Sequence, residues 1–312
     1  MKQWLMIALV LATAMGLAQG SKRTTAPVFD NPEHGTQAYW KGLTFQPDTS
    51  DETGKRGTWK GWFRQDNIDL SKYDQGVIRA KVEGKWQDLK VVSLPQDFLD
   101  WNFGRRREQL AEIKKMFSGD GGMGGARPEI AGPHNAIVAS HGAKRKDSDF
   151  AINNAVKGTG WLPKPERIAG MLDLLRQTWD DSMHLKIALL ESLYTKETGI
   201  YDVTKQASLE LYSQPNFETH SFLNQMVDAA VAVVFLDLPK SYELRCVAQM
   251  LHPDDPGLTE YERNVVEYIN LVHDYFHGQA PRKSIGVIYH VVQVFDNSPG
   301  KMRGQRIVPQ LP

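Results

Sequence analysis

Two histidines four residues apart are the side chains of this sequence best suited to metal chemistry. In the stretch LVHDYFHG, residues 271–278, His273 and His277 are separated by four positions, and Asp274 directly follows the first. Residues at positions i and i+4 lie on nearly the same face of an α-helix, so both imidazoles can reach one cation. His273 and His277 are therefore candidate ligands for a divalent metal such as zinc.

The order His-Asp-x-x-His resembles the His-Glu-x-x-His signature of zinc metalloproteases. Asp274 would take the place of the general base, although its side chain is one methylene shorter than that of glutamate. A catalytic zinc also needs a third protein ligand, for which the downstream His290 is a candidate. On this interpretation the protein is a divalent-metal-dependent hydrolase.

A structural interpretation of the same residues is simpler, and we favour it. His277 is followed by Gly278, and Pro281 comes three residues later. A basic residue, then glycine, then proline is the usual end of a helix. Thr259 and Glu262 have the spacing of a capping box, which predicts the start of the same helix.

Tryptophans near the N-terminus suggest a different kind of site. Exposed indole rings form flat apolar platforms that bind sugar rings or segments of a protein partner. A small β domain also needs bulky aromatic residues simply to fill its core. The candidate residues of this ligand-binding surface are Trp40, Trp59, Trp62 and Trp86.

Composition limits the classes of function. Lys plus Arg and Asp plus Glu both total 37, so the chain lacks the excess of positive charge that nucleic-acid binding requires. Cys246 is the only cysteine, which excludes an internal disulfide, a cysteine-ligated zinc and an iron–sulfur cluster.

The first residues have the features of a bacterial signal peptide. Lys2 precedes an apolar run that is too short to span a membrane comfortably, and small residues at 16 and 18 predict cleavage after Ala18. We expect a flexible leader over 19–38 and no further membrane-spanning segment. The mature protein would be soluble and either periplasmic or extracellular.

The pattern of residues predicts an α+β protein in two parts. Short aromatic and β-branched runs over 39–94, followed by a helix over 96–117, predict a small N-terminal antiparallel β unit, either an SH3-like barrel or a sheet. Residues 118–149 are rich in glycine and are expected to be a linker or loop.

Residues 150–312 are expected to form a larger, mostly α-helical domain that ends in a β hairpin. Apolar residues at helical spacing predict helices over 164–179, 181–199 and 241–252. Residues 220–237 fit one helix or a helix that runs into a strand, and 283–295 fit a buried strand. The sequence therefore favours an exported binding or structural protein of the cell envelope, with an envelope polymer or a protein as partner, over the hydrolase.

Overall fold

The computed structural model describes residues 38–48, 50, 57–118, 132–195, 199–300 and 304–310. The expected signal peptide (1–18), almost all of the leader (19–38) and most of the glycine-rich segment (119–131) lie outside the described residues. The helices and strands in chain order are β1 (Lys41–Pro47), β2 (Gly57–Trp62), β3 (Ile68–Asp69), η2 (Tyr73–Gln75), β4 (Val77–Val82), β5 (Lys85–Lys90), α2 (Gln96–Ser118), β6 (Asn135–His141), β7 (Ile152–Gly158), α3 (Pro165–Gln177), α4 (Met183–Leu193), β8 (Lys205–Glu210), α5 (His220–Val227), β9 (Ala230–Asp237), β10 (Lys240–Leu251), α6 (Glu260–His277), β11 (Ile285–Asp296) and β12 (Gln305–Val308).

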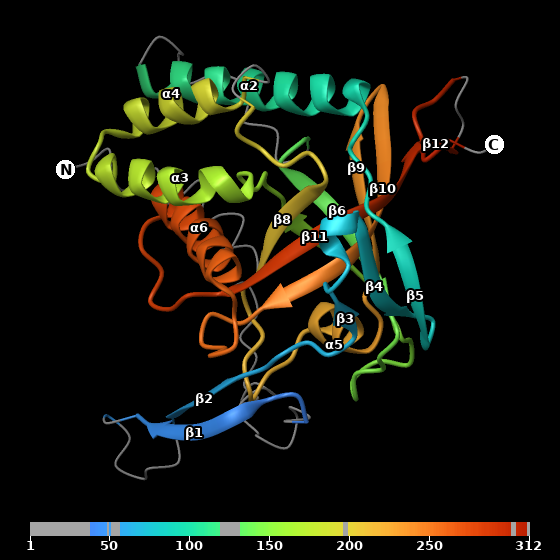
Figure 1. Ribbon diagram of the computed structural model, residues 1–312. Coiled ribbons are helices and arrows are strands. Elements are labelled where there is room, and N and C mark those ends of the chain that lie inside the picture. Colours follow the sequence, from blue (N-terminus) through green and yellow to red (C-terminus); the bar gives the residue numbers. More distant parts are fainter. Residues whose placement is uncertain are drawn as a thin grey trace.

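A large antiparallel sheet is the centre of the molecule (Figure 1). Its strands follow the order β12-β11-β10-β9-β6-β7, and β8 pairs with β11. The sheet curls until the chain just after β7 meets β8 through a bridge between Gly160 and Ala207. This closure gives a barrel whose interior is filled by alternate residues of each strand, among them Val138, Val233, Leu244 and Tyr289.

A helix covers each end of the barrel. At one end, Phe98 of α2 packs with its ring centroid 5.5 Å from that of Phe235 and 5.2 Å from that of Tyr242. At the other end, Asn224 of α5 donates a hydrogen bond to the hydroxyl of Ser140, 3.2 Å away. Both helices close the apolar interior off from water, and Figure 1 shows them above and below the strands.

Part of the outer wall of the barrel is covered as well. Helix α6 packs on β8 and β11, where the absence of a side chain at Gly286 lets Val266 and Ile269 approach the strand. The three-stranded sheet β3-β4-β5 packs over the middle of β10 and β11, where Ile78 and Ala80 bury Val247. We call the part of β10 and β11 beneath it, with Val247, Gln249 and His290, the roofed stretch.

The prediction of a mostly helical C-terminal domain is wrong. Strand exceeds helix, and the large sheet holds three strands, β6, β7 and β8, that lie in segments expected to be linker or helical. Residues 241–252, expected to be a helix, are β10. The reason is that Tyr242, Leu244 and Cys246 face the barrel interior at a spacing of two, which the helical interpretation overlooked.

Other local predictions are confirmed. Helix α6 begins after the capping box of Thr259 and Glu262 and ends at His277. Residues 220–237 are a helix followed by a strand, and β11 and β12 form the C-terminal hairpin.

Residues 39–117 share their core with the rest, since Trp40, Phe63 and Phe98 belong to the same cluster of buried residues as the barrel interior. No helix within the described ranges is long and apolar enough to cross a membrane.

Candidate binding site

No helix or strand among the described residues covers one side of the barrel wall. Antiparallel partners point to the same face of a sheet, and successive pairings across β7, β6, β9, β10, β11 and β12 define one continuous outward row. We call this row the open wall. Its members are Val156, Ile137, Val234, Glu243, Phe295 and Arg306.

The polarity of the side chains changes along the open wall. Its β7, β6 and β9 end is apolar, and the side chains of Val156 and Ile137 are 70% and 44% exposed. Its β10, β11 and β12 end is polar and charged. Because a soluble protein seldom leaves a run of aliphatic side chains on a flat sheet face in water, this surface is typical of a contact with something else.

A cavity of about 730 Å³ lies at the charged end of the open wall. Strands β10, β11 and β12 and the second residue beyond β12 supply its lining. Two of these residues carry guanidinium groups, three carry carboxamides and one is aromatic. They are Arg245, Arg306, Gln293, Gln305, Gln310 and Phe295.

Several hydrogen-bond donors in the lining of this cavity have no partner among the described residues. The Nε atom of Arg306 is buried and has no hydrogen-bond partner among the described residues. Within the described ranges, no side-chain hydrogen bond joins Gln293, Gln305 or Gln310 to the protein. Buried polar groups are normally paired, so the unpaired nitrogen of Arg306 calls for an explanation, and its place beside the cavity makes an acceptor from outside one candidate.

Arg245 is held in place at the edge of the cavity. Its guanidinium carbon lies 4.3 Å from the centroid of the Phe295 ring, and its Nε donates to the carboxylate of Glu243 at 2.9 Å. Stacking on an aromatic ring fixes the plane of a guanidinium while leaving its outer nitrogens free to donate. Arg245 and Arg306 thus present positive charge to the same hollow.

The histidine pair lies elsewhere, at the end of α6. The ring centroids of His273 and His277 are 4.8 Å apart, as their spacing predicts. However, Nδ1 of His273 lies 3.1 Å from the carboxylate of Asp274, its own neighbour. Burial, and then the charge of His273, lower the pKa of His277.

The third expected ligand of a metal is not near this pair. His290 is buried on β11 beneath the β3-β4-β5 sheet, with Nδ1 3.0 Å from the hydroxyl of Tyr73 and Nε2 2.9 Å from Oε1 of Gln249. Burial, and then the charge of Lys205, lower the pKa of His290 to about 3. Across the described part of the chain no group of three metal-ligating side chains is found, so the metal and the base role of Asp274 stay predictions.

The four candidate tryptophans do not form one surface. Trp40 is buried in the core, where its Nε1 donates to Glu218 at 2.8 Å. Trp59 and Trp62 lie in the β1-β2 hairpin, with Lys41 5.3 Å from the centroid of the Trp62 ring. Trp86, which is 45% exposed, lies in a different sheet beside Arg79. Trp59 and Trp62 share β2, but at a spacing of three they point to opposite faces of that strand.

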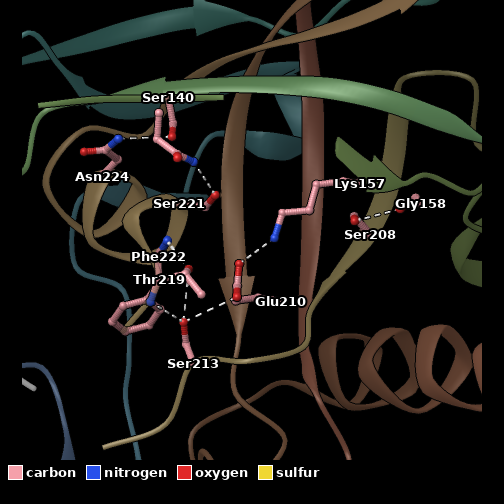
Figure 2. A network of polar contacts seen from close by, with 11 residues as sticks. Ser140, Lys157, Gly158, Ser208, Glu210, Ser213, Thr219, Ser221, Phe222 and Asn224 are labelled. Atoms are coloured by element: carbon pink, nitrogen blue, oxygen red, sulfur yellow. Dashed lines mark hydrogen bonds and ion pairs between the residues drawn. The ribbon is translucent and has the colours of Figure 1, made fainter. Parts of the chain in front are cut away.

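Inside the barrel, a polar network surrounds a buried ion pair (Figure 2). Nζ of Lys157 lies 2.7 Å from Oε2 of Glu210, and both side chains are almost fully covered. Ser213 donates to the other oxygen of Glu210 and contacts Thr219, the cap of α5. Because its charged groups are paired with each other, we assign this network to the fold.

Sequence reasoning missed the arginines of the cavity. Arg245 was placed on an expected helix, and Arg306 lies in a short run that was expected only to end the hairpin. The signal that could have found Arg245 is the alternation in SYELRC, which puts Glu243 and Arg245 on one face of a strand and Tyr242 and Leu244 on the other. The pairing of Phe295 with Arg306 depends on a bulged register that local spacing does not reveal.

Comparison with known proteins adds little. No family model matches the chain, and no curated protein matches it. Among solved structures, HupZ of Group A Streptococcus is 14% identical over 55% of this chain and 90% of its own, with a TM-score of 0.30. A protein of Clostridium acetobutylicum related to general stress protein 26 of B. subtilis, from the pyridoxinephosphate oxidase family, is 9% identical over 62% of this chain and 92% of its own, with a TM-score of 0.28. Likeness at this level supports no statement about function.

Proposed function

We propose that this is an exported bacterial protein that acts by binding an extended polymer of the cell envelope along its open wall. The observation that carries the proposal is the continuity of that wall, from the exposed aliphatic side chains of β7 and β6 to the cavity with Arg306. Adjacent strands lie about 4.8 Å apart, so a row across six strands is long enough to contact several units of a polymer.

The first residues support export. Lys2, the apolar run after it and the small residues Gly16 and Ala18 fit the three regions of a signal peptide. N-terminal sequencing of the protein recovered from fractionated bacterial cells is the test. We expect the mature chain to begin at Gln19 and to leave the cytoplasm; a chain retained in the cytoplasm with residues 1–18 intact would contradict export.

Co-sedimentation with purified cell-wall sacculi tests the binding surface. The double variant Ile137→Ser/Val156→Ser removes two of the three aliphatic side chains of the open wall and is expected to lower the bound fraction several-fold. Trp86→Ser is the matched control, because Trp86 is 45% exposed and Ile137 is 44% exposed but the two lie in different sheets. Loss of binding in the control, with binding kept in the double variant, would move the site to the tryptophans and overturn the proposal.

The hydrolase alternative rests on the 4.8 Å approach of the His273 and His277 rings. It requires a third ligand, and His290 is held by Tyr73 and Gln249 beneath the β3-β4-β5 sheet. The geometry therefore supports binding better than metal-dependent chemistry.

A further inference from the structure

We propose that the cavity between β10, β11 and β12 binds an oxyanion, a carboxylate or a phosphate, carried by a sugar unit. This inference rests on the proposed function, because it assigns the chemistry of the unit that binds at the charged end of the open wall. The volume of the cavity, about 730 Å³, lies within the range of small-molecule sites.

Charge is the first reason for an anion. Arg245 and Arg306 both line the cavity, and Glu243 beside them already binds Arg245 at 2.9 Å. In the part of the chain that the structure describes, Arg306 forms no salt bridge. One guanidinium charge is therefore left for a ligand to neutralise, and the planar fork of arginine matches the two oxygens of a carboxylate or phosphate.

The unpaired nitrogen of Arg306 is the second reason. Its Nε is buried from water and has no hydrogen-bond acceptor among the described residues. A buried donor without an acceptor is unfavourable, and a ligand oxygen that meets this nitrogen once the guanidinium turns toward the cavity would remove the deficit. Because a guanidinium can only donate, the group that binds it must be an acceptor.

The carboxamides point to a sugar rather than a bare anion. Gln293, Gln305 and Gln310 line the same hollow, and each carries both a donor and an acceptor. Sugar hydroxyls also donate and accept, so they can satisfy both halves of a carboxamide. An inorganic anion would use only the NH₂ groups, and the three carbonyl oxygens would then face water rather than the ligand.

Isothermal titration calorimetry on the full mature chain tests this inference. The probes are a galacturonate trimer for a carboxylate, glucose 1-phosphate for a phosphate, inorganic phosphate for a bare anion, and a galactose trimer as the neutral match of the first. We expect at least one charged sugar to bind at least tenfold more tightly than both inorganic phosphate and the neutral trimer. We also expect its affinity to fall as salt is raised.

Arg306→Gln should weaken binding of that charged sugar at least tenfold. Arg79→Gln should change it less than twofold. Arg79 is a matched control, because it also lies over an aromatic ring, Trp86, and near an acid, Asp88, but outside the cavity. Thermal unfolding of both variants would show that they are folded.

Three results would overturn the inference: no binding of either charged sugar, equal binding of the neutral trimer, or an Arg306→Gln variant that binds like the wild type. These results are distinguishable from failure of the proposed function. If sacculi still bind and the Ile137→Ser/Val156→Ser variant still loses them, the open wall remains the site and only the chemistry assigned to the cavity is wrong.

Discussion

The roofed stretch and the charged end of the open wall are neighbouring parts of β10 and β11, yet their polar groups have different surroundings. In the roofed stretch, His290 is held between Tyr73 and Gln249, and Nε2 of Gln249 donates to Glu262 at 2.9 Å. Three residues further along β11, Gln293 faces the cavity.

The difference follows from what covers each stretch. Sheet β3-β4-β5 and the turn with Tyr73 exclude water from the roofed stretch, so each polar group there needs a protein partner. None of the described elements covers the open wall, so its polar groups can be hydrated or can bind a ligand. Cover by a second layer therefore distinguishes His290 and Gln249, which are bound within the protein, from Gln293, which faces the cavity.

The largest expected effect is at Lys205 of β8, which pairs with His290 and so borders the roofed stretch. Lys205 is buried, its Nζ lies 3.0 Å from Asp202, and it lies 4.8 Å from the centroid of the Tyr73 ring. Burial opposes its charge, but Tyr261, Asp202 and Tyr73 raise the pKa of Lys205 above its ordinary value. Lys205→Ala leaves a carboxylate without its partner and should lower the free energy of unfolding by about 3–5 kcal/mol.

Urea unfolding followed by circular dichroism measures this change. Lys205→Met combined with Asp202→Asn removes both charges and should cost less than the single change. A Lys205→Ala variant as stable as the wild type would mean that pairing does not distinguish the two stretches.

The next effect is a dependence of stability on pH. The pKa of His290 is about 3 in the folded protein, below the value of about 6.5 for an unperturbed histidine. Between these values the unfolded chain binds a proton that the folded chain does not. The stability due to neutral His290 is therefore complete above pH 6.5 and is lost as pH falls toward 3, at about 1.4 kcal/mol per pH unit.

His290→Gln cannot take up this proton, so its stability should fall less steeply between pH 6 and 4. The measurement is urea unfolding of both proteins across this range. If the stability of the two proteins fell in parallel with pH, His290 would already be protonated in the folded protein. That result would contradict the pairing described for the roofed stretch.

The open wall should behave differently. The side chain of Arg245 is about half exposed, and that of its ionic partner Glu243 is partly exposed. Arg245→Gln should change the free energy of unfolding by less than about 0.5 kcal/mol, because surface ion pairs contribute little. Thermal unfolding checks this. A loss as large as that of Lys205→Ala would make Arg245 part of the structure rather than of a binding site.

The smallest expected effect concerns the histidine pair. His273 is held by Asp274, and within the described residues no third ligand joins it and His277. Elemental mass spectrometry of the purified mature protein and of the double variant His273→Ala/His277→Ala should therefore give equal metal contents. Near-stoichiometric zinc, manganese or iron that disappears in the variant would favour the hydrolase instead.

The parts of the fold that could be predicted are those whose signals are local. The capping box of α6 lies within four residues, and the turn at Glu83 and Gly84 joins two strands that are adjacent in sequence. Strand β6 pairs with β9, almost a hundred residues away, and nothing near residues 135–141 indicates that pairing. Strand β10 was missed because its buried outer residues, Val247 and Gln249, hide the alternation of its inner face.

The candidate site was predictable to a smaller extent. The spacing of His273 and His277 correctly placed their rings together, but spacing alone cannot say whether a third ligand converges on them. The cavity requires β10, β11 and β12 to lie side by side, so Arg245 and Arg306, 61 positions apart, become neighbours only in the folded sheet.

Nuclear magnetic resonance of the arginine side chains tests the central claim most directly. The Nε–H resonance of Arg306, assigned by its loss in Arg306→Lys, would be followed while a galacturonate trimer is added. We predict a saturable shift of this resonance, a shift of Arg245, and none of Arg79. An unchanged Arg306 resonance, with binding observed by calorimetry, would contradict the claim that the open wall and its cavity bind the ligand.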